Sequence, residues 1–224
     1  MRLPPARLVR WKTSYRIIAS RYPPIDVFER TGMDGDAAAA LFALEQRTKP
    51  PLAPGQAITG PGAGFAMAPF LYTNPKGSRF TDGSFGAWYV ARALETALRE
   101  TVYHWGRFAR DSADPPGRAE DMRVLTTPLN ARLIRVGDLG EDAAPLLDPD
   151  SYVASQRFGA QVRAAGETGM QFPSVRHAGG QCACLYSPRA VTLPISQERH
   201  LKYHWDGARV DRVFDYKLDA WQIL

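Results

Sequence analysis

The stretch from Gly77 to Trp105 constrains the fold most, because a loop signal, a short apolar run and an amphipathic segment follow one another in it without interruption. The apolar run, residues 85–91 (FGAWYVA), is short and rich in aromatic residues, which predicts a buried strand. After it, apolar residues recur at helical spacing: Leu98, Val102, Trp105 and Ala109. We therefore predict a loop, a strand and a helix in direct succession.

Three polar residues mark these three predicted elements. Arg79, Tyr89 and Glu100 are spaced ten and then eleven residues apart. Such spacing suggests that a loop, a strand and a helix each offer one side chain to a common cleft. Glu100 lies off the apolar stripe, about 200° round the helix from Leu98. An ordinary solvent-exposed carboxylate is therefore the simpler alternative for Glu100.

Each of the other candidates also has a structural alternative. Arg79 suits bidentate binding of a phosphate, but it could be a loop arginine paired with Asp82. Tyr89 could stack on a planar ligand, or it could be a core tyrosine with one satisfied hydroxyl. Ser174 follows Pro173, and its hydroxyl could bind a ligand or close its own turn.

Length and composition indicate one soluble globular domain. The chain has 224 residues, of which 45% are hydrophobic and 23% charged. Residues 1–11 are basic and contain prolines, so we expect an N-terminal arm there and one domain over residues 12–224. Apolar runs are too short for a transmembrane helix, and the first residues lack the apolar centre of a signal peptide. We therefore expect no membrane association and a cytoplasmic protein.

The cysteines and histidines argue against a metal site. Cys182 and Cys184 are too close in sequence for an unstrained bridge, so we expect two buried thiols. His200 and His204 have the spacing of ligands on a helix, but no glutamate and third ligand complete that pattern. We expect no metal.

A net charge of +5 suits an anionic ligand or partner. One non-enzymatic alternative is a nucleic-acid-binding protein with exposed tryptophans as stacking platforms, namely Trp11, Trp105 and Trp205. The basic residues are spread along the chain rather than clustered, which argues against this alternative. We expect no direct binding of nucleic acid. Walker, Gly-x-Ser-x-Gly, His-Glu-x-x-His and Gly-x-Gly-x-x-Gly motifs are all missing from the sequence.

Outside the central stretch we predict several further elements. Residues 65–73 are read as a strand, and residues 122–129 and 131–137 as two edge strands separated by a turn at Asn130. Residues 151–167 have helical spacing, residues 181–186 form a strand, and residues 201–224 form a hairpin at the Asp206-Gly207 turn signal.

Five short motifs carry a resemblance to a known family. They are Tyr15-Arg16, Gly-x-Arg-aromatic at residues 77–80, an aliphatic-tyrosine strand near Tyr89, Glu-Thr-Ala-x-x-Glu ending at Glu100, and Phe-Pro-Ser-Val-Arg at residues 172–176. In this order and spacing the chain resembles the RES domain family, over about residues 12–216. The family loop usually reads Gly-Arg-Trp-Asn, whereas residues 78–81 read Ser-Arg-Phe-Thr. Residues 106–122 look like an insertion.

This resemblance implies a fold and a function. The implied fold is α/β (α+β), a single compact domain with a split, twisted mixed sheet flanked by helices, similar to ADP-ribosyltransferase toxins. The implied function is that of a toxin in a bacterial toxin-antitoxin pair, with NAD+ as substrate and without a further cofactor. NAD+ would be broken down by hydrolysis or phosphorolysis, or its ADP-ribose transferred to a protein. The implied partner is an antitoxin with a helix-turn-helix DNA-binding domain.

The resemblance also implies site residues. Arg79, Glu100 and Ser174 match the arginine, glutamate and serine of the family, and the implied pocket residues are Tyr15, Arg16, Phe80 and Tyr89. Catalytic roles would fall to Arg79, Glu100 and Tyr89. Glu100 would stabilise an oxocarbenium-like ribose. Arg79, helped by Arg16, would hold the pyrophosphate, Tyr89 or Tyr15 would stack on nicotinamide or ribose, and Ser174 would position one end of the dinucleotide.

Overall fold

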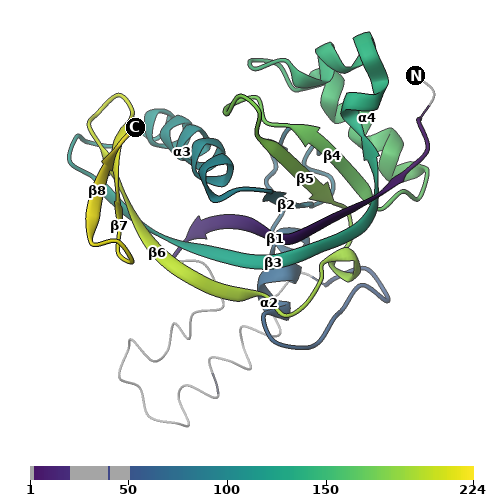
Figure 1. Ribbon diagram of the computed structural model, residues 1–224, viewed down its shortest axis with the longest axis horizontal. Coiled ribbons are helices and arrows are strands. Elements are labelled where there is room, and N and C mark those ends of the chain that lie inside the picture. Colours follow the sequence, from purple (N-terminus) through teal and green to yellow (C-terminus); the bar gives the residue numbers. More distant parts are fainter. Residues whose placement is uncertain (1–2, 21–39, 41–50) are drawn as a thin grey trace.

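The computed structural model describes residues 3–20, 40 and 51–224 (Figure 1). In chain order its elements are β1 (Arg7–Ala19), α2 (Ala63–Leu71), β2 (Trp88–Ala91), α3 (Leu94–Asp111), β3 (Ala119–Arg135), the 3-10 segment η2 (Val136–Leu147), α4 (Val153–Ala164), β4 (Gly169–Pro173), β5 (Gln181–Leu185), η3 (Pro188–Ala190), β6 (Ser196–Trp205), β7 (Val210–Asp215) and β8 (Ala220–Ile223).

The strands of the described residues form one eight-stranded mixed sheet in the order β1-β2-β5-β4-β3-β6-β7-β8. The β3–β4 pair is parallel, and the other pairs are antiparallel. β1 also pairs with β3, from Arg7 opposite Leu133 to Ala19 opposite Met122. This extra pairing closes a circuit of five strands, so the sheet curves back on itself. The predicted α+β class with a mixed sheet and flanking helices is confirmed.

Two apolar clusters hold the sheet and helices together. Figure 1 shows α3 on one side of β1, β3 and β6, and α2 on the other. Leu98, Trp105 and Ala109 of α3 are buried in the larger cluster, which confirms the predicted apolar stripe. Ala66 of α2 belongs to the smaller cluster, which joins β1 and β3 to β2 and β5. Burial of each large apolar side chain stabilises this arrangement by about 1.5–3 kcal/mol.

The core includes three tryptophans that the sequence analysis had considered as exposed stacking platforms. Trp11, Trp105 and Trp205 are 7%, 7% and 1% exposed. They are therefore core residues, and the expectation of exposed stacking platforms is wrong. Cys182 and Cys184 are free and buried, as predicted. Within the described part of the chain, no helix is both long enough and apolar enough to cross a bilayer.

The expected arm of residues 1–11 merges with the domain at Arg7, where β1 begins. Val9 and Trp11 are buried on one face of β1, and the backbone from Arg7 to Trp11 pairs with the end of β3. Basic residues at alternating positions face solvent, which explains why the segment reads as a polar arm. The structure therefore moves the start of the folded domain to residue 7 or earlier.

β3 is one strand of 17 residues rather than two edge strands with a turn at Asn130. Asn130 lies opposite Arg10 in the ladder, so pairing with β1 overrides the local turn signal. Pro128 falls at the irregularity between the Trp11 and Ser14 pairings, where a strand tolerates a residue without an N–H donor.

Three other expectations differ in detail. Residues 65–73 fall mostly in the helix α2, not in a strand, because a short apolar run does not distinguish the two. Residues 106–122, read as an insertion, comprise the end of α3, a turn and the start of β3. The predicted C-terminal hairpin is present as β6 and β7, and β8 extends it.

Candidate functional site

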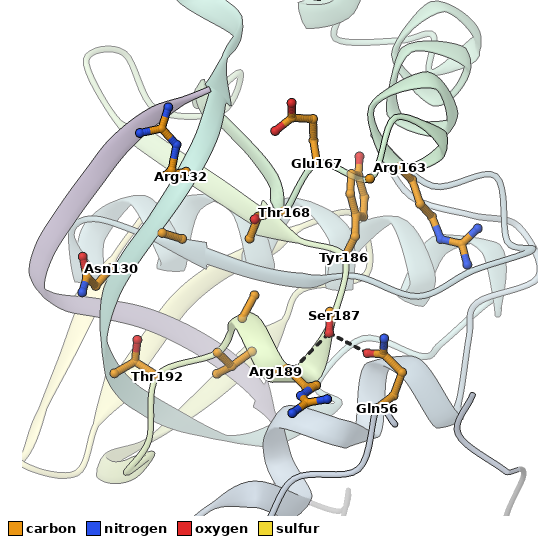
Figure 2. Close-up of a pocket in the computed structure, with 14 residues that line it drawn as sticks. Gln56, Asn130, Arg132, Arg163, Glu167, Thr168, Tyr186, Ser187, Arg189 and Thr192 are labelled. Carbon is orange, nitrogen blue, oxygen red and sulfur yellow. Dashed lines mark hydrogen bonds between the residues drawn. The ribbon is translucent and has the colours of Figure 1, made fainter. Parts of the chain in front are cut away.

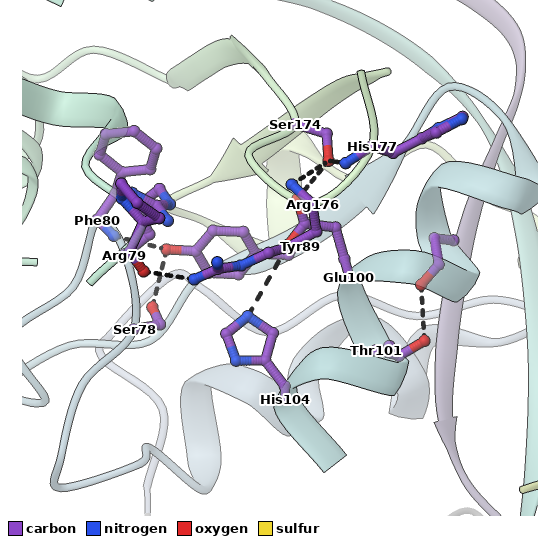
Figure 3. Close-up of polar contacts among 12 residues, drawn as sticks. Ser78, Arg79, Phe80, Tyr89, Glu100, Thr101, His104, Ser174, Arg176 and His177 are labelled. Atoms are coloured by element: carbon purple, nitrogen blue, oxygen red, sulfur yellow. Dashed lines mark hydrogen bonds and ion pairs between the residues drawn. The ribbon is translucent and has the colours of Figure 1, made fainter. Parts of the chain in front are cut away.

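A cavity of about 680 Å³ opens between β1, β2, α3 and the loop before Arg79. Five of the sequence-predicted site residues line it: Tyr15, Arg16, Arg79, Tyr89 and Glu100. The predicted loop, strand and helix therefore do offer side chains to a common cleft, as Figure 3 shows for Arg79, Tyr89 and Glu100. The volume is within the range of small-molecule sites in proteins.

A tight turn presents Arg79. Gly77 has a φ of 71°, and a Cβ there would collide with the backbone carbonyl of Thr81. Arg79 is only 8% exposed. Its Nη1 donates to the carbonyl oxygens of Leu146 (3.3 Å) and Asp148 (2.7 Å). The alternative pairing with Asp82 is not what the structure shows, since that carboxylate accepts from the N–H and hydroxyl of Ser84.

Tyr89 anchors this turn from β2. Its hydroxyl accepts a hydrogen bond from the Phe80 N–H (3.0 Å) and lies 2.8 Å from Ser78 Oγ. Burial raises the pKa of Tyr89 well above its usual range, so the hydroxyl stays protonated. The ring of Tyr89 lines the cavity, whereas the hydroxyl holds the Arg79 loop.

β1 contributes Tyr15 and Arg16. The Nη1 of Arg16 donates to the backbone carbonyl of Tyr89 (3.0 Å), and its guanidinium lies 4.7 Å above the Trp88 ring. Burial lowers the pKa of Arg16 to about 10, so the side chain remains charged near neutral pH. This second cation, which is partly buried, lines the cavity together with Tyr15.

Glu100 accepts a hydrogen bond from the hydroxyl of Ser174 (Figure 3). Ser174 Oγ accepts hydrogen bonds from the N–H groups of Arg176 (3.2 Å) and His177 (3.0 Å). Its own proton is therefore directed to Glu100 Oε1, 2.6 Å away. Ser174 therefore closes its own turn, which was one of the two roles considered from the sequence. Instead of the other role, direct contact with a ligand, its hydroxyl orients the carboxylate of Glu100.

Two of the expected binding residues do not line the cavity. The Phe80 ring is fully buried and packs edge-to-face on Phe172, with 4.8 Å between ring centroids. Only the backbone of Phe80, through Tyr89, supports the site. Ser174 is outside the lining and acts through Glu100.

His104 is a cavity residue that sequence reasoning missed. Its Nε2 lies 3.9 Å from Glu100 Oε2, one helical turn along α3. Half of the His104 side chain is exposed, and partial desolvation at the cavity wall lowers its pKa. Glu100 opposes this effect, and Arg176, Arg79 and Arg107 reinforce it. The available signal was its position four residues after the predicted catalytic glutamate. The imidazole is therefore mainly neutral at pH 7.

This pKa predicts that acid destabilises the fold through His104. The unfolded chain takes up the proton near pH 6.5, before the folded chain does, so stability falls as the pH drops below that value. We expect His104→Gln to reduce the slope of melting temperature against pH between 6.5 and 5, and to leave it unchanged above pH 7. Thermal unfolding of both proteins across pH 5–8 measures this. Identical slopes below pH 6.5 would contradict the assignment.

A second hollow, of about 850 Å³, is lined by part of β3, the end of α4 and the turn after it, the residues just after β5, and η3 (Figure 2). Ser187 Oγ, within it, donates to Gln56 Oε1 and accepts from the N–H of Arg189. None of the sequence-predicted site residues lines this second hollow. The cavity at Glu100 is therefore the candidate active site.

Comparison with known proteins gives matches of three kinds. The family described as RES domain matches residues 56–206, a span that includes Arg79, Tyr89, Glu100 and Ser174. The protein y4oC of Sinorhizobium fredii (strain NBRC 101917 / NGR234) is 30% identical over 211 residues, covering 90% of this chain and 86% of that protein. A chain in the crystal structure of the M. tuberculosis MbcT-MbcA toxin-antitoxin complex has 12% identity and a TM-score of 0.48, over 86% of this chain and 85% of that chain.

Proposed function

Since the chain belongs to the RES domain family, we propose that it is the toxin of a bacterial toxin-antitoxin pair and that it breaks down NAD+ at the nicotinamide-ribose bond. The observation that carries this proposal is the carboxylate of Glu100, ordered by Ser174 inside a cavity that three arginines and three tyrosines also line.

Glu100 is the residue suited to the chemical step. Breaking the bond between ribose C1′ and the nicotinamide nitrogen leaves positive charge on the ribose, and a nearby carboxylate stabilises that charge. Because Ser174 occupies Oε1, Oε2 is the oxygen available to the sugar. The bonding electrons pass to the pyridinium ring, which leaves as neutral nicotinamide. A second carboxylic acid is therefore unnecessary.

The remaining side chains bind and orient the substrate. The rings of Tyr15 and Tyr89 offer apolar surfaces for nicotinamide and ribose, as aromatic side chains do in many small-molecule sites. Arg79 and Arg16 supply positive charge inside the cavity. The acceptor of the ADP-ribose is water or phosphate in this proposal, and NAD+ itself is the only small molecule that the reaction needs besides this acceptor. Transfer to a protein side chain is the alternative outcome.

A partner antitoxin would restrain this activity by covering the cavity. The net charge of +5 favours a partner that presents acidic residues. We propose that this partner carries a helix-turn-helix DNA-binding domain, as the family resemblance implies.

Expression in a bacterial host tests the toxin proposal. We expect induction to stop growth and to lower cellular NAD+ before viability falls, and we expect neither effect from the Glu100→Gln variant at equal protein level. Growth arrest with NAD+ unchanged would contradict NAD+ breakdown as the cause, and normal growth at high expression would contradict the toxin proposal.

Ser174→Ala is expected to lower kcat about tenfold to a hundredfold while KM for NAD+ changes little. The variant loses the hydroxyl that orients Glu100 and leaves two N–H groups without their acceptor. Ser174→Thr keeps a hydroxyl and should restore most of the rate. The exposed Ser151, near the start of α4, gives a matched control as Ser151→Ala. An unchanged kcat for Ser174→Ala would show that Glu100 does not depend on this hydrogen bond.

A further inference from the structure

One wall of the cavity is a stripe along α3 that runs from the interior to solvent. Glu100, His104, Arg107, Phe108 and Asp111 all line the cavity, at the spacing of one helical face. Glu100 is partly buried, whereas Arg107 and Asp111 are exposed. At 1.5 Å per residue, Arg107 lies roughly 10 Å along the helix axis from Glu100. The stripe therefore joins the proposed reaction centre to an exposed mouth that carries the cation Arg107 and the anion Asp111.

Lys76, in the loop before Arg79, also lines the cavity and is exposed. Its backbone N–H donates to Asn74 Oδ1 (3.0 Å), and Asn74 Nδ2 donates to the Gly77 carbonyl (2.9 Å). The Gly77 N–H in turn donates to the Asn74 carbonyl (2.8 Å). This bonded turn fixes the backbone at Lys76, whose exposed side chain lines the cavity.

The cations inside the cavity differ from those at its mouth. Arg79 and Arg16 already donate to backbone carbonyls and lie over the rings of Tyr152 and Trp88. Among the described residues, the side chains of Lys76 and Arg107 have neither a hydrogen bond nor an ion pair. A bound anion would therefore meet two uncommitted charges at the mouth, without displacing any contact of the fold.

We propose that the pyrophosphate of the dinucleotide binds at the mouth, between Lys76 and Arg107, and that the nicotinamide ribose extends inward to Glu100. This inference rests on the proposed function. The sequence led us to expect that Arg79 and Arg16 bind the pyrophosphate, whereas this proposal assigns that role to Lys76 and Arg107. Lys76 and Arg107 would contribute to substrate affinity and not to the chemical step.

The direct test is binding of ADP-ribose, which carries the pyrophosphate, measured by isothermal titration calorimetry. We expect the double variant Lys76→Ala, Arg107→Ala to bind ADP-ribose about tenfold more weakly than the wild type, and to lose most of the salt dependence of binding. Exchange of the two cations, Lys76→Arg with Arg107→Lys, should keep the affinity. Arg157→Ala removes an exposed arginine of α4 that does not line the cavity, and it serves as the control.

Steady-state kinetics with NAD+ separate this proposal from the proposed function. The double variant should raise KM about tenfold with kcat unchanged. Undiminished ADP-ribose binding by the double variant, a loss equal to that of Arg157→Ala, or no binding by the wild type would each overturn the proposal. Weakened ADP-ribose binding by a protein that does not cleave NAD+ would support the phosphate site and refute the proposed reaction.

Discussion

Glu100→Gln is expected to reduce kcat for NAD+ breakdown by about a hundredfold to a thousandfold, the range seen when one electrostatic stabiliser of a transition state is removed. Glutamine has nearly the same shape, and its side-chain oxygen can still accept the hydrogen bond from Ser174. The variant lacks the negative charge that would face the oxocarbenium-like ribose. We therefore expect KM to change much less than kcat.

Glu95→Gln is the matched control for this variant. Glu95 lies on the same helix, is exposed, and pairs with Arg99 at 2.7 Å. Its substitution removes the same charge at a surface position, where such pairs contribute about 0–1 kcal/mol. Steady-state kinetics and melting temperatures of the wild type, Glu100→Gln and Glu95→Gln test whether the charge of Glu100 acts in the chemical step. Equal rates for Glu100→Gln and wild type, with both folded, would remove Glu100 from the chemistry.

Arg79→Ala is expected to lower both stability and activity. The substitution leaves the carbonyl oxygens of Leu146 and Asp148 without their donor and removes the guanidinium from above Tyr152. A buried charged hydrogen-bonding group of this kind contributes about 2–4 kcal/mol to the free energy of unfolding. For a chain of this length, such a loss lowers the melting temperature by roughly 5–15 °C. NAD+ breakdown should fall at least about a hundredfold, because the cavity loses its shape and one of its two inner cations.

Two further variants show whether the loss in Arg79→Ala comes from the charge, from the shape of the guanidinium, or from removal of any arginine. Arg79→Lys keeps the charge but not the planar fork, so it should recover some stability and little activity. Arg163→Ala removes an exposed arginine whose guanidinium lies over Phe85, and its melting temperature should stay within about 2 °C of the wild type. A wild-type melting temperature for Arg79→Ala would show that the two carbonyl contacts do not support the fold.

The local pattern of the sequence was sufficient to predict the elements that carry Arg79, Tyr89 and Glu100. The helical spacing of apolar residues after a short aromatic run is a local signal that depends on few long-range contacts, so the predicted helix is present in the structure. The same reasoning could not tell whether Glu100 was a surface carboxylate. That depends on Ser174, which is 74 residues away along the chain and meets Glu100 only when the turn after β4 packs against α3.

Long-range pairing also explains the failures. Asn130 carries a turn signal, but the ladder with β1 keeps it within a continuous strand. Arg7 and Arg10 give the first residues the character of an arm, whereas Val9, between them, and Trp11, after them, are core residues. In each case the deciding partner lies more than a hundred residues away. Local patterns in a single sequence do not indicate which distant segment will pair with a given residue.

Tyr89 and Phe80 show how a motif residue can serve a site indirectly. The Tyr89 hydroxyl holds the Phe80 backbone, and the Phe80 ring packs on Phe172 beneath the loop. Together they fix the turn that presents Arg79. Because phenylalanine at position 80 is fully buried in this packing, the departure from the tryptophan usual in the family is absorbed by the core, away from the cavity lining.

The most direct test is to incubate the purified protein, freed of any partner, with NAD+ in the presence and absence of phosphate, and to identify the products by mass. We expect free nicotinamide together with ADP-ribose or its 1″-phosphate from the wild type, and no product from Glu100→Gln. NAD+ that remains intact under both conditions would contradict the proposed hydrolysis and phosphorolysis alike.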